Sequence, residues 1–249
     1  MPASALLIGA SAARIASLNL CADEYALLLA RPGELVSVTR LARDPLESPL
    51  AARARAIPAN RGSLEDVVAM RPTVILTMGG AGRSTSLLAG RLGVRTIDLP
   101  SPTDIAGVER NLRTVASALG DVRRAQPWLT RIARLRANRP AVQRDALYLS
   151  GGGVSIGSWS PAVEWMSLAG LRQRKLSAGK VTLEQLLADP PAVMLRSNYR
   201  AGQMSLGQRW FDHPIVRRST RRAIATDGRA WTCAGPLMIG EIERLRARL

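Results

Sequence analysis

The chain has 249 residues, 47% of them hydrophobic and 22% charged, a composition typical of folded globular proteins and not of disordered ones. This length allows one large domain or two smaller ones. The net charge of +16 would suit nucleic acid, but the basic residues are scattered and no nucleic-acid-binding motif accompanies them. We therefore expect no nucleic-acid partner, whereas an anionic ligand fits the charge.

The N-terminal residues 1–13 are small and apolar and end in Ala10-Ser11-Ala12-Ala13, like the cleavage site of a secretory signal. The charged beginning of such a signal is missing and the apolar run is short. We interpret the segment as a truncated signal peptide, with a frayed N-terminus as the alternative. No later stretch reaches the roughly 18 to 20 apolar residues of a membrane span, so we expect the mature protein to be soluble.

Strand and helix patterns alternate in the first half of the chain. Strands are expected over residues 14–20, 35–38, 74–77 and 94–99, and helices over residues 23–30 and 84–92. This alternation indicates an α/β fold with parallel strands. The glycine-rich residues 78–82 follow the third strand, where such a turn can bind phosphate. Their spacing fits neither a dinucleotide fingerprint nor a Walker A loop, and we favour a plain tight turn.

Two helical stretches follow, over residues 104–119 and 122–137, and the second has two interpretations. Its apolar residues at helical spacing predict either an ordinary core helix or a rigid strut between two lobes. Beyond it, strands are expected over residues 146–149, 193–197 and 223–226, a loop over residues 231–236, and then a terminal helix.

Residues 63–76 and 182–195 repeat one plan. Each segment begins with a hydroxyl residue that can cap a helix, has a polar residue three positions later, and ends its helix at a proline before a buried strand. The matching residues are Ser63 and Thr182, Asp66 and Gln185, and Pro72 and Pro191. A helix–proline–strand unit used twice predicts two α/β lobes of similar plan.

Catalytic and metal-binding residues are scarce. His213 is the only histidine, and Cys21 and Cys233 are the only cysteines. A single histidine beside a proline offers no pairing of nucleophile and base, and a transition-metal ion would want more ligands. The sequence therefore indicates binding and not catalysis, with no metal and no cofactor of the protein's own. The two cysteines could pair with each other, which sequence alone does not decide.

Six segments together resemble the periplasmic substrate-binding proteins of cobalamin, haem and iron–siderophore ABC importers. They are residues 14–24, 61–65, 71–76, 183–195, 213–214 and 231–236. The resemblance implies the class III periplasmic binding protein architecture, with two Rossmann-like α/β lobes that have central parallel sheets and are joined by one long rigid helix. It also implies a ligand held between the lobes and delivered to ABC permease subunits at the membrane. We accordingly expect a periplasmic monomer that is not an enzyme.

The resemblance also places the lobes and the ligand. It implies an N-terminal lobe over residues 14–120, an interlobe helix over 121–139 and a C-terminal lobe over 140–249. Ligands of α/β lobes sit at strand ends. The candidate ligand-binding residues at or beside those ends are Leu20, Cys21, Arg40, Leu41, Arg43, Thr77, Met78, Gly79, Trp159, Tyr199, Trp231 and Cys233.

The ligand that the resemblance implies is a corrinoid or an iron chelate. Within the family we favour the cobalamin branch, because Trp159, Tyr199 and Trp231 would form aromatic walls around a large planar metal complex. Arg40 and Arg43 would instead suit an anionic siderophore or the propionates of haem, through charge-assisted hydrogen bonds.

The chain departs from the family at the expected permease contact. The family's acidic residue that pairs with permease arginines would lie near Arg83, which has the opposite charge. Glu47 or Glu65 is the alternative for that contact.

A different class of protein is the alternative to the whole interpretation. A two-lobed metallocluster enzyme of related architecture would use cysteines at the lobe interface, here Cys21 and Cys233. A cluster usually wants about four thiolates, which two cysteines do not supply.

Overall fold

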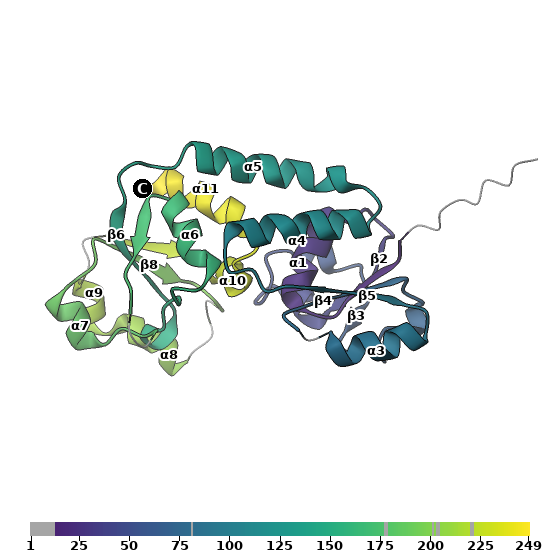
Figure 1. The fold of residues 1–249 in the computed structure, drawn as a ribbon. Helices are drawn as coiled ribbons and strands as arrows, with labels where there is room; N and C mark the ends of the chain where they lie inside the picture. The colour runs from purple at the N-terminus through teal and green to yellow at the C-terminus, as the bar shows by residue number, and fades with distance from the viewer. Residues whose placement is uncertain (1–12, 81, 177–178, 201, 203–204, 220–221) are drawn as a thin grey trace, which may run out of the picture.

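Two parallel sheets organise the chain, and each forms the centre of one α/β lobe (Figure 1). The computed structural model describes residues 13–80, 82–176, 179–200, 202, 205–219 and 222–249, so all but the last residue of the candidate signal segment 1–13 lies outside the described part. The pairings between the named strands are parallel throughout. The predicted architecture of two α/β lobes is confirmed.

The first lobe has five strands in the order β3-β2-β1-β4-β5. The strands are β1 (Ile15–Ser17), β2 (Leu35–Thr39), β3 (Ala59–Asn60), β4 (Val74–Met78) and β5 (Arg95–Leu99). The helices are α1 (Leu20–Leu29), α2 (Ala51–Ala54) and α3 (Arg83–Arg91), with 3-10 turns η1 (Arg40–Arg43) and η2 (Val68–Met70). The central strand β4 is buried on both faces, because Leu76 packs in the cluster of α1 and Ile75 packs with Ala89 of α3.

The second lobe has four strands in the order β7-β6-β8-β9. The strands are β6 (Arg144–Leu149), β7 (Leu171–Gln173), β8 (Val193–Ser197) and β9 (Ala223–Thr226). The helices are α6 (Pro161–Leu168), α7 (Leu183–Ala188), α8 (Leu206–Arg209), α9 (Pro214–Arg218), α10 (Gly228–Cys233) and α11 (Met238–Arg248), with 3-10 turns η4 (Gly151–Gly153) and η5 (Trp210–Asp212). In both lobes the strand order reverses in the middle of the sheet, and ligands of such sheets bind at the carboxyl ends of the strands around that point.

Helix capping explains two differences from the expected elements. The first strand ends early because the Asn19 side chain accepts hydrogen bonds from the amides of Cys21 and Ala22, which starts α1 at Leu20. The expected loop over 231–236 is helical up to Cys233, because Asp227 caps the start of α10.

The two repeated segments fold differently. At Thr182 the complete capping box forms, and α7 follows it as predicted. At Ser63 the hydroxyl accepts from the Asp66 amide at 3.4 Å, but the Asp66 carboxylate accepts from the Arg61 amide at 2.7 Å and does not close the box. The chain there makes turns and the short η2 instead of the predicted α-helix, because the following Val67 and Val68 are weak helix formers.

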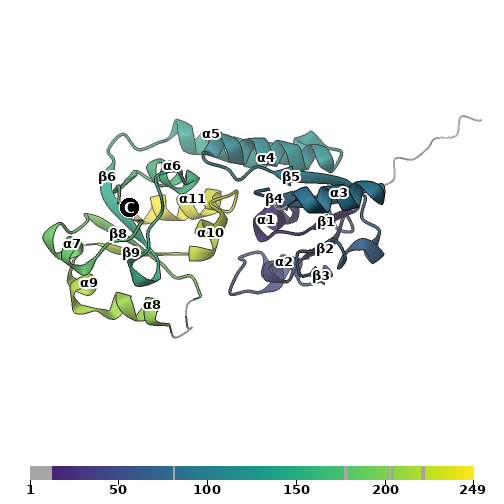
Figure 2. The ribbon, with the colours of Figure 1, turned by 60° about the horizontal axis from the view of Figure 1, so that its bottom comes forward.

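The chain passes between the sheets through α4 (Ile105–Ala118), η3 (Val122–Ala125) and α5 (Gln126–Ala137), which run along one side of both lobes (Figures 1 and 2). Arg124 of η3 binds the Glu34 carboxylate of the first lobe at 2.5 and 2.8 Å. Arg131 of α5 binds the Glu243 carboxylate of the second lobe at 2.5 and 3.1 Å. These ion pairs favour the strut interpretation of this segment, while the lobe boundaries stay predictions.

One apolar cluster runs through both lobes. It includes Leu76 of β4, Tyr25 of α1, Trp165 of α6 and Ile242 of α11, and each of these side chains is at most 1% exposed. Separating the lobes would expose apolar surface at a cost of about 25 cal/mol per Å². The shared core therefore opposes a wide opening of the two lobes.

Candidate functional site

A pocket of about 490 Å³ lies between the lobes, at the carboxyl ends of β8 and β9. Its first-lobe wall comes from the loop between η1 and α2, which points toward the second lobe in Figure 2. The lining residues are Pro45, Leu46, Asn198, Arg200, Ala225, Thr226, Asp227, Arg229 and Arg248. Three arginines and a single carboxylate among them make this lining basic.

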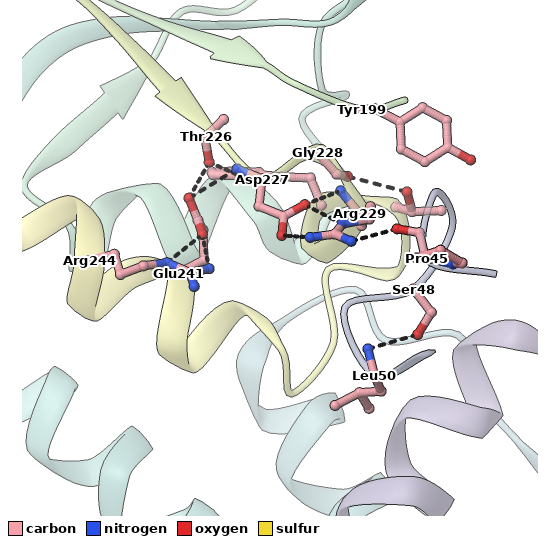
Figure 3. Close-up of polar contacts among 12 residues, drawn as sticks. Pro45, Ser48, Leu50, Tyr199, Thr226, Asp227, Gly228, Arg229, Glu241 and Arg244 are labelled. Carbon is pink, nitrogen blue, oxygen red and sulfur yellow. Dashed lines mark hydrogen bonds and ion pairs between the residues drawn. The ribbon is translucent and has the colours of Figure 1, made fainter. Parts of the chain in front are cut away.

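Arg229 connects the lobes at this pocket (Figure 3). Its guanidinium holds both oxygens of Asp227 at 2.8 and 2.7 Å and donates to the Pro45 carbonyl of the first lobe at 2.6 Å. Burial opposes ionisation of Asp227, but the hydrogen bonds from Arg229 outweigh it, so the pKa of that carboxyl lies below its usual value. Asp227 thus stays ionised and fixes Arg229 on the pocket wall.

Glu47 makes the second connection. Its carboxylate accepts from the Tyr199 hydroxyl and pairs with the Arg200 guanidinium, both from the loop after β8. The Glu47 side chain is only 5% exposed. Glu47 therefore binds groups of the second lobe. Of the two acids expected as alternatives for the permease contact, only Glu65 is exposed.

Of the residues predicted from strand ends, Arg40, Leu41 and Arg43 lie on η1, just before the pocket loop, and all three are exposed. Thr39 fixes the start of this turn. Its hydroxyl accepts from the Ala42 amide and donates to the buried Asp23 carboxylate at 2.5 Å. Neither Arg40 nor Arg43 lines the pocket, although both precede its first-lobe loop in the chain.

The predicted residues at the end of β4 are Thr77, Met78 and Gly79, and the bonds of Thr77 and Gly79 stabilise the turn that follows this strand. The Thr77 hydroxyl donates to the Asp98 carboxylate at 2.7 Å, and the Gly79 amide donates to the Leu99 carbonyl at 2.9 Å. Thr77 and Met78 are 2% and 6% exposed, so they offer little surface to a ligand in this conformation. Gly79 has a φ of 78°, which a glycine adopts without strain and which supports the tight-turn interpretation.

The three aromatic residues expected to form ligand walls lie in different surroundings. Trp159 is 78% exposed on the loop before α6. Trp231 is buried, stacks on Tyr148 with ring centroids 4.6 Å apart, and donates from its indole to the Thr226 hydroxyl at 2.7 Å. Tyr199 is half-buried by its contact with Glu47. The structure does not bring these rings together into one aromatic wall.

Leu20 and the two cysteines lie where α1 meets α10. Leu20 is half-buried at the start of α1, and Cys21 and Cys233 form a disulfide with their Cα atoms 5.4 Å apart. This bond answers the question that the sequence left open and joins the two lobes covalently. Because both sulfurs are used, the metallocluster alternative loses the thiolates on which it depended.

Two acids on α1 are buried beside this disulfide. Burial raises the pKa of Asp23 to about 7, against the hydrogen bonds from Thr39 and Ser17. Burial, and then the charge of Asp23, also raises the pKa of Glu24 well above its usual value. Among the described residues the Glu24 Oε2 atom has no hydrogen-bond partner. A Cβ on Gly235 would lie 2.9 Å from that oxygen, so glycine allows the close approach of the second lobe.

None of the ligand-binding residues predicted from the sequence lines this pocket, and Arg229 and Arg200 are the most important residues that the prediction missed. The rule that ligands bind at strand ends reaches Asn198 and Asp227, which directly follow β8 and β9. It does not show that the loop at Pro45 crosses to the other lobe. Among the helices that the structure describes, none is long and apolar enough to cross a membrane.

Comparisons with known proteins agree with this architecture. A family model described as periplasmic binding protein matches residues 15–217. Characterised protein sequences give no match.

Three solved structures have a similar fold. The periplasmic haem-binding protein RhuT from Roseiflexus sp. RS-1 is 23% identical, with a TM-score of 0.69 over 95% of this chain and 97% of that chain. The periplasmic haem-binding protein HutB of Vibrio cholerae is 19% identical, with a TM-score of 0.72 over 95% and 98%. The periplasmic vitamin B12-binding protein BtuF of Vibrio cholerae is 18% identical, with a TM-score of 0.67 over 95% and 96%.

Proposed function

The chain belongs to the periplasmic binding protein family, and from this we propose that it is the substrate-binding component of an ABC importer for an anionic metal chelate. Haem is the leading candidate for the chelate. The protein acts as a monomer that captures the chelate between its lobes and delivers it to a membrane permease. No step of this function requires catalysis.

The basic lining of the interlobe pocket carries the choice of ligand. Arg200, Arg229 and Arg248 line the pocket. These three arginines outnumber the two carboxylates that pair with them, Asp227 and Glu47. Guanidinium groups bind carboxylates through paired, charge-assisted hydrogen bonds. Haem and many ferric siderophores carry such acidic groups at their periphery, whereas the corrin ligand offers mainly neutral amides.

The aromatic residues support the same choice. We favoured cobalamin from the sequence because three aromatic side chains would enclose a planar complex, but Trp231 packs in the core of the second lobe and donates to Thr226. Trp231 therefore offers little ring surface to a ligand in this conformation, and the charge of the pocket is the stronger basis for recognition. Relatives of the same fold include haem-binding proteins, which fits this proposal.

Titration with haemin, cyanocobalamin and a ferric siderophore tests the proposal, read by the haem absorbance band and by thermal shift. A ligand at about 100 times its dissociation constant adds about 2.7 kcal/mol of stability, which raises the melting temperature by roughly 5–10 °C for a chain of this size. We expect this shift with haemin and not with cyanocobalamin. The opposite pattern would overturn the proposed ligand class.

Arg229→Gln should weaken haemin binding at least tenfold, because it removes one charge-assisted bond. Arg91→Gln is the matched control, since Arg91 is exposed on α3 away from the pocket. Equal losses in both variants would mean that general charge, and not the pocket, attracts the ligand.

A further inference from the structure

The loop that carries Glu47 is built to place this carboxylate in the second lobe. Asp44 turns the loop: its side chain accepts from the Leu46 amide at 2.8 Å, and its carbonyl accepts from the amides of Glu47 at 3.0 Å and Ser48 at 2.9 Å. Pro45 is held from the other side by Arg229. These bonds hold the backbone of the loop at Glu47, from which the side chain reaches the second lobe.

The partners of Glu47 belong to the pocket. Arg200 lines the pocket and Tyr199 is the next residue before it, and both direct their donor groups to the Glu47 carboxylate. Glu47 itself is 95% covered, while the Arg200 side chain remains 44% exposed. The Glu47 carboxylate thus occupies hydrogen-bond donors of Arg200 and Tyr199 that a ligand in the basic pocket could otherwise use.

We propose that Glu47 is a specificity-determining residue that competes with the ligand's own carboxylate for Arg200 and Tyr199. This inference rests on the proposed function and adds to it how the ligand is selected. A chelate is bound when one of its acidic groups takes these donors from Glu47 and a second group engages Arg229. Small monocarboxylates are rejected, because Glu47 is tethered to the same protein and has a high effective concentration at Arg200.

The charge change on exchange is balanced. In the unliganded protein the Glu47 carboxylate neutralises Arg200, and in the complex the ligand's carboxylate does so while Glu47 moves toward solvent, where ionised carboxylates are stable. A ligand without an acidic group cannot make this exchange. Glu47 therefore sets a threshold for acidic ligands, which a chelate passes only when its second acidic group engages Arg229.

Glu47→Gln tests the inference with haemin and with haemin dimethyl ester, which has the same ring but no acidic groups. Loss of the competing charge should tighten haemin binding about tenfold, the effect of one charge-assisted hydrogen bond, and should change binding of the ester less than twofold. Glu47→Asp, whose shorter side chain does not reach the donors as well, should also tighten haemin binding. Glu65→Gln, at an exposed acid of the same lobe, should change neither.

The possible results separate the two proposals. If wild-type protein binds haemin and Glu47→Gln binds it equally or more weakly, or if both ligands change by the same factor, Glu47 is only a tie between lobes and the inference is wrong. If neither the wild type nor the variants bind haemin, its ester or a ferric siderophore, the proposed function is wrong and the inference falls with it. Denaturant unfolding of each variant shows that the proteins compared are folded.

Discussion

Removal of the Cys21–Cys233 disulfide should destabilise the protein strongly. The bond joins residues 212 positions apart in the chain, so it closes nearly the whole molecule into a loop. The entropy of closing a loop of that length corresponds to about 5 kcal/mol, and measured disulfides typically contribute about 2–4 kcal/mol. We therefore expect Cys21→Ser combined with Cys233→Ser to lower the free energy of unfolding by about 3–5 kcal/mol and the melting temperature by roughly 10 °C.

Urea unfolding followed by tryptophan fluorescence measures this change, with reduced wild-type protein as a second sample. Reduction should lower the stability of the wild type and leave the double serine variant unchanged, which separates loss of the bond from other effects of the reductant. Equal stability of the oxidised and reduced wild type, within about 1 kcal/mol, would refute the reasoning, because the loop-closure effect at this length exceeds that value.

Three further changes test other parts of the structure. Trp165→Ala should cost about 3–5 kcal/mol in thermal or urea unfolding, since this side chain is fully buried and its indole donates to the Ala234 carbonyl at 2.9 Å. Asp23 has a pKa of about 7 in the folded protein and 3.8 in the unfolded chain, so the free energy of unfolding should fall by up to about 4 kcal/mol as pH rises between these values. Asp23→Asn should flatten this part of the pH–stability curve, and an unchanged slope would contradict the raised pKa. Gly228→Ala should weaken both ligand binding and stability, because the new Cβ would lie 2.7 Å from the Tyr199 backbone nitrogen. Gly90→Ala is its control, since a Cβ there meets no neighbouring atom on α3, and it should be neutral or stabilising by up to about 1 kcal/mol.

Most strands of the two lobes can be predicted from the sequence. The apolar runs at 74–77 and 193–197 predict buried parallel strands, and both are found as β4 and β8. The prediction fails at the helix before β4, where the Asp66 carboxylate accepts from the Arg61 amide, whereas Gln185 closes the capping box of α7. The β-branched Val67 and Val68 that follow also disfavour the helix.

The residues that line the pocket are harder to predict from the sequence. Strand-end reasoning finds residues that follow strands, such as Tyr199, but it does not show which of them face an open pocket and which, like Trp231, turn into the core. Contacts between Glu47 and the loop after β8 join positions more than 150 residues apart. Such contacts depend on how the lobes face each other, and no local pattern encodes that arrangement.

The core shared by both lobes also constrains the order of events during synthesis. Tyr25 and Ala26, near the beginning of the described chain, pack in the same cluster as Met238 and Ile242, near its end. Within the first lobe α1 already packs against β4 and α4, but the part of the cluster that comes from the last helix is missing until that helix leaves the ribosome. The contacts that join the two lobes are therefore the last part of the core that can form.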